Sequence, residues 1–113
     1  MANGKSEQLL ESMVEVTIEI INLTKNKEIP RPIAEQIIKS ISSIGANFSE
    51  AQEASSKKDF INKIYIAKKE AQETRYWLKV IERITSIDDK IKGEVSRFIM
   101  TLQKIITTSK EKH

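Results

Sequence analysis

Two groups of side chains in the middle of the sequence could do chemistry. The first is polar and mostly acidic, and comprises Asn47, Glu50, Asp59, Glu70 and Glu73. Paired carboxylates can transfer protons or bind a divalent cation. Because no neighbouring loop predicts a cleft, we interpret these five residues as structural, held by hydrogen bonds or salt bridges.

The second group is basic and aromatic. If residues 58–83 are helical, its members fall within about 120° of one another at 100° per residue. They are Lys58, Lys68, Lys69, Arg75, Lys79 and Arg83, with Tyr65 and Tyr76 in the same arc. Cations can contact phosphates while aromatic rings stack on unpaired bases, so this pattern favours nucleic-acid binding. The alternative interpretation is a Lys/Arg-rich face that is only solvated.

Most catalytic and metal-dependent chemistry is excluded by the residues that the sequence lacks. Its one histidine is His113, and it contains no cysteine. A haem ligand, a zinc site, a di-metal Glu-x-x-His site and a nucleophile with a histidine base are therefore not expected. Gly4, Gly45 and Gly93 stand too far apart to form a phosphate-binding loop. We predict a protein that is not an enzyme and has no catalytic residues, metal or cofactor.

Composition and charge predict a small cytoplasmic protein with a single domain. At 113 residues the chain fits a single domain over residues 1–113. The absence of cysteine agrees with a reducing compartment, and no apolar run predicts a signal peptide or a membrane span. Residues 1–56 carry 5 basic and 8 acidic side chains, whereas residues 57–113 carry 14 and 8. This asymmetry suggests a basic surface for an acidic partner, or two opposite surfaces that meet between subunits.

Apolar periodicity predicts four helices, at roughly residues 6–25, 32–54, 57–85 and 88–109. Their apolar positions recur mainly at alternating spacings of 4 and 3, which is typical of near-parallel helix packing. The four seams are Leu9, Met13, Val16, Ile20 and Leu23; Ile33, Ile37, Ile41, Ile44 and Phe48; Phe60, Ile64, Ala67, Ala71, Thr74, Leu78 and Ile81; and Ile91, Val95, Phe98, Leu102 and Ile105. Short connections make successive helices antiparallel, so we predict an all-α, up-down-up-down four-helix bundle.

Local signals mark the helix ends. Ser6 is a plausible N-cap of the first helix, and Pro32 suits the first turn of the second. Ser56 and Asp59 have the spacing of a capping box. Gly45 lies in the middle of the second helix, where it costs about 1 kcal/mol relative to Ala. A close approach by another helix, either within the subunit or between subunits, is its expected reason.

The first two helices carry features that favour self-association. Leu10, Val14, Ile18 and Ile21 widen the apolar arc of the first helix to about half its circumference. A stripe of like charges at Glu7, Glu11, Glu15 and Glu19 is expected on the opposite side of that helix. The stripe is either a solvated face or a surface for a basic partner. We predict a homo-oligomer.

Residues 40–51 (SISSIGANFSEA), Asp59-Phe60 and residues 66–78 (IAKKEAQETRYWL) together resemble the bacterial 23S rRNA intervening sequence proteins. Gly45, Asn47, Glu50, Asp59, Glu70 and Trp77 match the family pattern. The resemblance implies a ring-shaped homopentamer of four-helix bundles, similar to the accessory variability determinant of diversity-generating retroelements, which binds RNA and a reverse transcriptase. It implies no catalytic residues.

These observations together predict a homo-oligomeric bundle, pentameric by resemblance, that binds RNA through the basic face of residues 57–85. The alternative is a protein-interaction scaffold or accessory subunit that docks a partner protein such as a reverse transcriptase.

Overall fold

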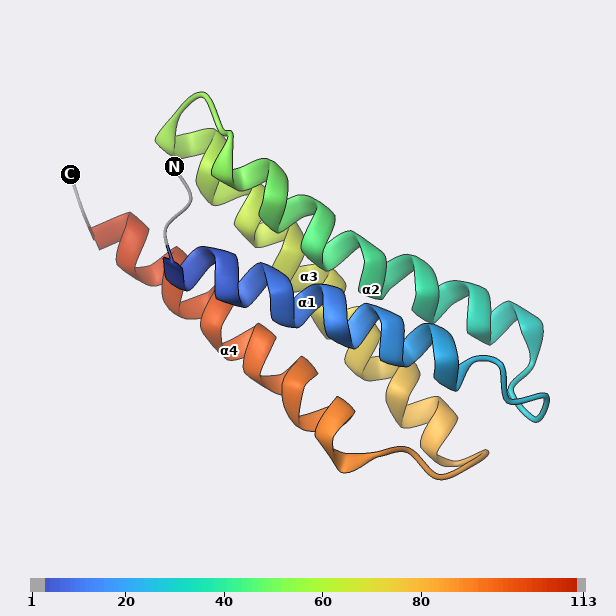
Figure 1. Ribbon diagram of the computed structural model, residues 1–113. Helices are drawn as coiled ribbons and strands as arrows, with labels where there is room; N and C mark the ends of the chain where they lie inside the picture. The colour runs from blue at the N-terminus through green and yellow to red at the C-terminus, as the bar shows by residue number, and fades with distance from the viewer. Residues whose placement is uncertain (1–3, 112–113) are drawn as a thin grey trace.

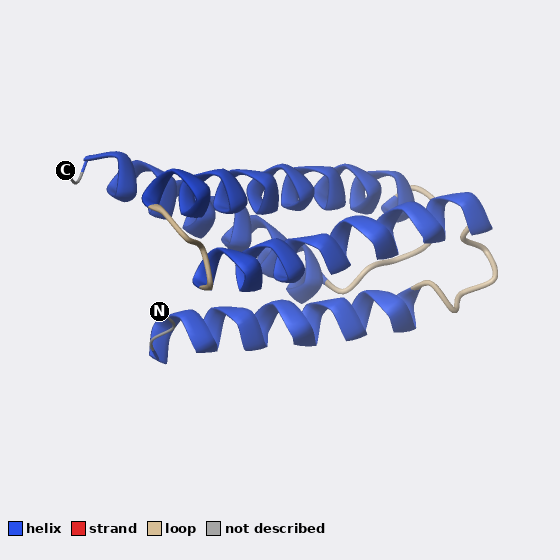
Figure 2. Ribbon diagram, turned by 90° about the horizontal axis from the view of Figure 1, so that it is seen from above, coloured by secondary structure: helices blue, strands red, loops and turns tan. Residues whose placement is uncertain are grey.

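The computed structural model describes residues 4–111, which form four α-helices and three short connections. The helices are α1 (Gly4–Leu23), α2 (Arg31–Gln52), α3 (Lys57–Glu82) and α4 (Asp89–Glu111). In Figure 1 they run side by side, and α1 begins at the same end of the bundle at which α4 ends. Figure 2, in which helices are blue, shows no strand among the described residues. The predicted all-α, up-down-up-down bundle is confirmed.

Helix ends differ from the predicted ranges by up to three residues. The N-cap predicted at Ser6 is wrong, because α1 already includes Gly4. Ser56 does cap α3, and its Oγ accepts a hydrogen bond from the Asp59 backbone N–H at 3.0 Å. Before α4, Asp88 Oδ1 accepts from the Lys90 backbone N–H at 2.9 Å, which moves the helix start to Asp89.

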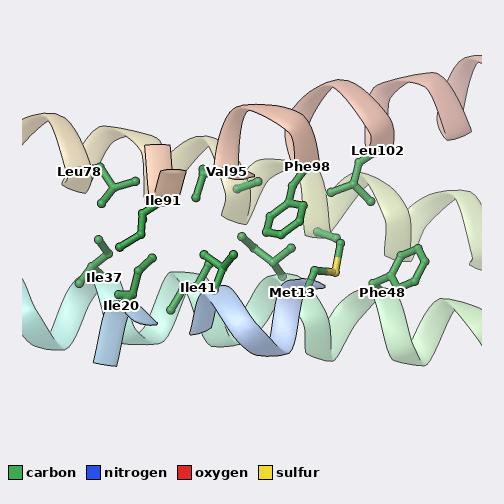
Figure 3. Packing of buried hydrophobic residues seen from close by; sticks show 14 of the residues in the cluster. Met13, Ile20, Ile37, Ile41, Phe48, Leu78, Ile91, Val95, Phe98 and Leu102 are labelled. Carbon is green, nitrogen blue, oxygen red and sulfur yellow. The ribbon is translucent and has the colours of Figure 1, made fainter. Parts of the chain in front are cut away.

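The helices enclose one apolar core that runs the length of the bundle. Figure 3 shows side chains from all four helices converging there, among them Met13, Phe48, Leu78 and Phe98. Every predicted seam residue lies in or against this core, with only Leu23, Ile33, Phe60 and Ile105 partly exposed. One polar contact crosses it, because Thr74 on α3 lies 2.8 Å from Ser40 on α2, hydroxyl to hydroxyl.

Helix α1 is the least enclosed of the four. It packs on α2 and α4, while α2 and α3 form the most extensive helix pair. Val14 is 48% exposed and Ile18 is 53% exposed, so part of the wide apolar arc of α1 remains uncovered in this chain. The close approach predicted at Gly45 involves α1, but an added Cβ there would lie 3.6 Å from Met13 Cβ, which is ordinary contact. The methyl group of an alanine would therefore fit.

Candidate nucleic-acid interface

The predicted basic residues lie on the flank of α3 that is turned away from the core, except Arg83, which follows the last residue of α3 as its C-cap. Burying Ile64, Ala67, Ala71 and Leu78 orients this flank, because side chains about 100° further round the helix must then face outward. Tyr65 is 48% exposed and Tyr76 is 57% exposed. We call the following eight residues the basic face of α3: Lys58, Lys68, Lys69, Arg75, Lys79, Arg83, Tyr65 and Tyr76.

Among residues 4–111, no carboxylate forms an ion pair with a cation of the basic face. Within residues 4–111, the ion pairs involve Arg31, Lys63, Lys90, Lys92 and Arg97, none of which belongs to this face. Lys68 instead donates to Gln103 Oε1 on α4 at 2.7 Å, and its Nζ lies 5.2 Å from the centroid of the Tyr65 ring. Five of the six cations are exposed, and Lys68 is half-buried.

Helix α4 lies beside the basic face of α3 and extends it. The sequence pattern of α3 alone did not reveal this contribution. Three cavities follow one another between the antiparallel helices, and we call this row the α3–α4 groove. A cavity of about 620 Å³ lies at the start of α3 and a middle cavity measures about 440 Å³. The last measures about 250 Å³. Their respective linings are Ser56, Lys58, Asp59, Ile61, Asn62, Tyr65 and Lys110; Lys68, Gln72, Ile99, Met100, Gln103 and Lys104; and Arg75, Leu78, Lys79, Glu82, Lys92 and Ser96.

Besides Lys92, which is paired with carboxylates, Lys104 and Lys110 are the cations of the groove that sequence reasoning missed. They lie six residues apart on α4, a spacing that does not place both on one helix face. Each enters the groove because it lies beside a different part of α3, Lys104 near Lys68 and Lys110 near Tyr65. Only the pairing of α3 with α4 brings them to the basic face.

In the third cavity, one of the three lining cations is paired with carboxylates. Lys92 Nζ lies 3.2 Å from Glu82 Oε1 and 3.3 Å from Asp89 Oδ1. The hydrogen bond with Glu82, followed by the one with Asp89, raises the pKa of Lys92. Two carboxylates thus balance its charge, whereas Arg75 and Lys79 form no ion pair with any of residues 4–111.

The acidic set does not gather into one site. Glu50 accepts a hydrogen bond from Lys63 Nζ at 2.9 Å, and Asn47 Nδ2 donates to the Ser43 carbonyl at 2.8 Å. Asp59 Oδ2 accepts from the Ser55 backbone N–H at 3.4 Å, next to the α3 cap. Among the described residues, no group of three or more acidic, histidine or cysteine side chains could hold a metal ion, and His113 lies outside them.

Glu70 and Glu73 lie beside Trp77 on the other flank of α3. Trp77 Nε1 donates to Glu73 Oε2 at 3.1 Å, and its ring meets Tyr76 edge-on with centroids 4.9 Å apart. Partial burial raises the pKa of the Glu70 carboxyl, and the nearby Glu73 charge adds to the rise, while Lys39 and Lys69 oppose it. Trp77 is partly buried against the core, as a packing residue would be.

Comparison with known proteins identifies the family. The family model for the 23S rRNA-intervening sequence protein matches residues 5–108, which span nearly all of the four helices. The chain belongs to this family. A crystal structure of a protein of unknown function from the S23 ribosomal protein family of Bacteroides thetaiotaomicron has 37% sequence identity and a TM-score of 0.80. The alignment covers 87% of this chain and 97% of that one.

The family assignment confirms the resemblance drawn from residues 40–51 and 66–78. Those segments form the α2 and α3 surfaces described above, so the family pattern lies on the most extensive helix pair of the bundle. No sequence among curated proteins matches the chain. Within residues 4–111, none of the helices has the length and apolar character needed to cross a membrane.

Proposed function

We propose that the protein is a non-enzymatic, cytoplasmic homo-oligomer that binds RNA through the basic face of α3. The observation that carries this proposal is the arrangement of six cations, none paired with a carboxylate within residues 4–111, beside two half-exposed tyrosine rings. Phosphates attract such cations, and rings of this kind offer stacking surfaces. A lysine-rich face that is only solvated would have no need for the exposed rings of Tyr65 and Tyr76.

Self-association is the second part of the proposal, with five subunits in a ring as the family resemblance implies. The exposed Val14 and Ile18 on α1 support it, because a second subunit would cover these two side chains. The acidic stripe of Glu7, Glu11, Glu15 and Glu19 follows the same helix, opposite in sign to the basic face of α3. Such an assembly presents the basic face once per subunit, which raises avidity for a long RNA.

The direct test compares two triple charge reversals that change the net charge equally. Lys68→Glu, Lys69→Glu and Lys79→Glu alter the basic face, whereas Lys5→Glu, Lys25→Glu and Lys39→Glu alter exposed lysines of α1, α2 and their connection. We expect the first triple variant to lose RNA binding in a filter-binding assay and the second to keep most of it. Equal affinities for the two variants and the unmodified protein would remove the proposal.

A protein-interaction scaffold is the competing function. In that case the protein should co-purify with a partner protein and without RNA, and the charge reversals on α3 should abolish the binding of that partner. This result would show that the basic face docks a protein instead of RNA.

A further inference from the structure

We infer that the RNA bound by this protein is an unpaired strand lying along the α3–α4 groove, with one base stacked on Tyr65 in the cavity of about 620 Å³. This inference rests on the proposed RNA-binding function and adds to it the class of RNA, its path and two contacts from α4, Lys104 and Lys110.

The groove has the length and charge spacing of a single-strand track. From Lys58 to Lys79, α3 rises about 32 Å at 1.5 Å per residue. Cations occur at three successive levels, namely Lys58 with Lys110, Lys68 with Lys104, and Arg75 with Lys79. At 3.4 Å per phosphate, the track accommodates at most about nine nucleotides of one strand.

The largest of the three cavities combines the groups that one unpaired nucleotide needs. Its volume of about 620 Å³ lies within the range of about 300–1,000 Å³ typical of small-ligand sites. Tyr65 and Ile61 provide an aromatic and an aliphatic wall, Asn62 offers an amide to a base edge, and Lys58 and Lys110 supply two cations for the flanking phosphates. Asp59, the one anion of the lining, lies 3.4 Å from the Ser55 backbone N–H, at the start of α3.

A duplex fits this surface less well than an unpaired strand. The faces of paired bases are stacked on one another, and the major groove of an RNA helix is too deep and narrow for side chains to reach them. Tyr65 could then contact only the backbone. An acidic protein segment would pair with the lysines, but its carboxylates would make no use of the Tyr65 ring that lines the cavity.

The first experiment uses the full chain and an unstructured RNA of about ten nucleotides, alone or annealed to its complement. We expect the single strand to bind more tightly than the duplex. Tyr65→Ala should weaken single-strand binding about tenfold, and Tyr65→Phe should retain it, because stacking needs the ring and not the hydroxyl. The slope of log K against log salt should be the same in Tyr65→Ala as in the unmodified protein, since no phosphate contact is removed.

The second experiment tests α4 with a double variant and a matched control. Lys104→Gln with Lys110→Gln should reduce the salt slope by about 1.4, at about 0.7 per lost phosphate contact with a single strand. Lys5→Gln with Lys39→Gln removes the same charge outside the groove and should leave the slope unchanged.

Three results would overturn the inference. They are equal affinity for strand and duplex, an unchanged affinity in Tyr65→Ala, or a salt slope that is the same in the two double variants. If the α3 charge reversals still abolish RNA binding in that case, the proposed function stands and only this inference fails. Displacement of the RNA by polyglutamate, with Tyr65→Ala as sensitive to it as the unmodified protein, would point to an acidic protein ligand instead.

Discussion

Gly45 occupies a half-buried position in the middle of α2, facing Leu10 and Met13 of α1. The sequence predicted that a neighbouring helix explains this glycine, and α1 does lie there. The space between Gly45 and α1 depends on how closely α1 packs on α2, which no local sequence pattern specifies. The gap accepts a methyl group at ordinary contact distance, so the glycine is not required by packing within one chain.

Replacing Gly45 by alanine is expected to stabilise the bundle by about 0.5–1 kcal/mol, because alanine loses less backbone freedom in a helix. Gly93→Ala on α4 is the matched control, since a Cβ there would meet nothing within 4 Å. Urea unfolding of the two variants should give similar gains. A loss of stability in Gly45→Ala alone would show that α1 lies closer to α2 than described.

Glu70 makes stability depend on pH in a predictable direction. Its pKa is raised in the folded chain, by burial and then by Glu73, so the folded state favours the protonated carboxyl more than the unfolded state does. Stability from this group is therefore present at low pH and is lost as pH rises from the ordinary value of 4.5 through the raised pKa.

Glu70→Gln removes this ionisation. We expect the free energy of unfolding of the variant, relative to the unmodified protein, to increase as pH rises from about 4 to 7. Urea unfolding at several pH values measures the difference. A difference that stays constant or shrinks over that range would contradict the assignment. Glu94, whose pKa is lowered by the hydrogen bond from Arg97, contributes in the opposite direction, but equally in both proteins.

At the scale of elements, the seams were predictable because helical periodicity is local. Leu9, Met13, Val16 and Ile20 repeat along α1 and are all buried. The outer arc of α1, meaning the apolar residues beside the seam, was harder to assign. Val14 and Ile18 in this arc are as apolar as the seam residues and yet lie exposed. The same limit applies to the candidate site. Its α3 residues share one helix face, whereas Lys104 and Lys110 join it only through the packing of α4 on α3.

Two isoleucines of α1 test this division between seam and outer arc. Ile20 is 0% exposed and Ile18 is 53% exposed. Ile20→Ala should cost about 2–5 kcal/mol of folding stability, because it leaves a cavity in the core. Ile18→Ala should cost less than about 1 kcal/mol at protein concentrations low enough to disfavour association. Thermal or urea unfolding would measure the stability of both variants. Equal losses of stability would mean that α1 is rotated about its own axis relative to the structure described.

At the scale of the whole molecule, charge and apolar surface are unevenly distributed. The acidic stripe follows α1, while the cations of the basic face and of the α3–α4 groove lie along α3 and α4. The exposed Val14 and Ile18 lie on the acidic helix, so the surface proposed for self-association is not on the helices that form the proposed RNA groove.

Val14→Ser combined with Ile18→Ser should therefore shift the protein from oligomer to monomer without unfolding it. Analytical ultracentrifugation would report the change in mass, and circular dichroism would check that helix content is unchanged. The control is Met100→Ser, an exposed apolar residue of α4 that is 72% exposed and lies away from α1. If both proteins keep the mass of the unmodified one, the α1 surface is not the contact between subunits.

RNA binding by the basic face is the central claim, and its salt dependence tests it most directly. The logarithm of the binding constant of the unmodified protein for a single-stranded RNA should fall linearly with the logarithm of the salt concentration. The slope should approach about −4 if all six cations of the basic face contact phosphates, at about −0.7 each. An affinity that is undetectable at low salt, or that stays constant between low and moderate salt, would contradict the claim.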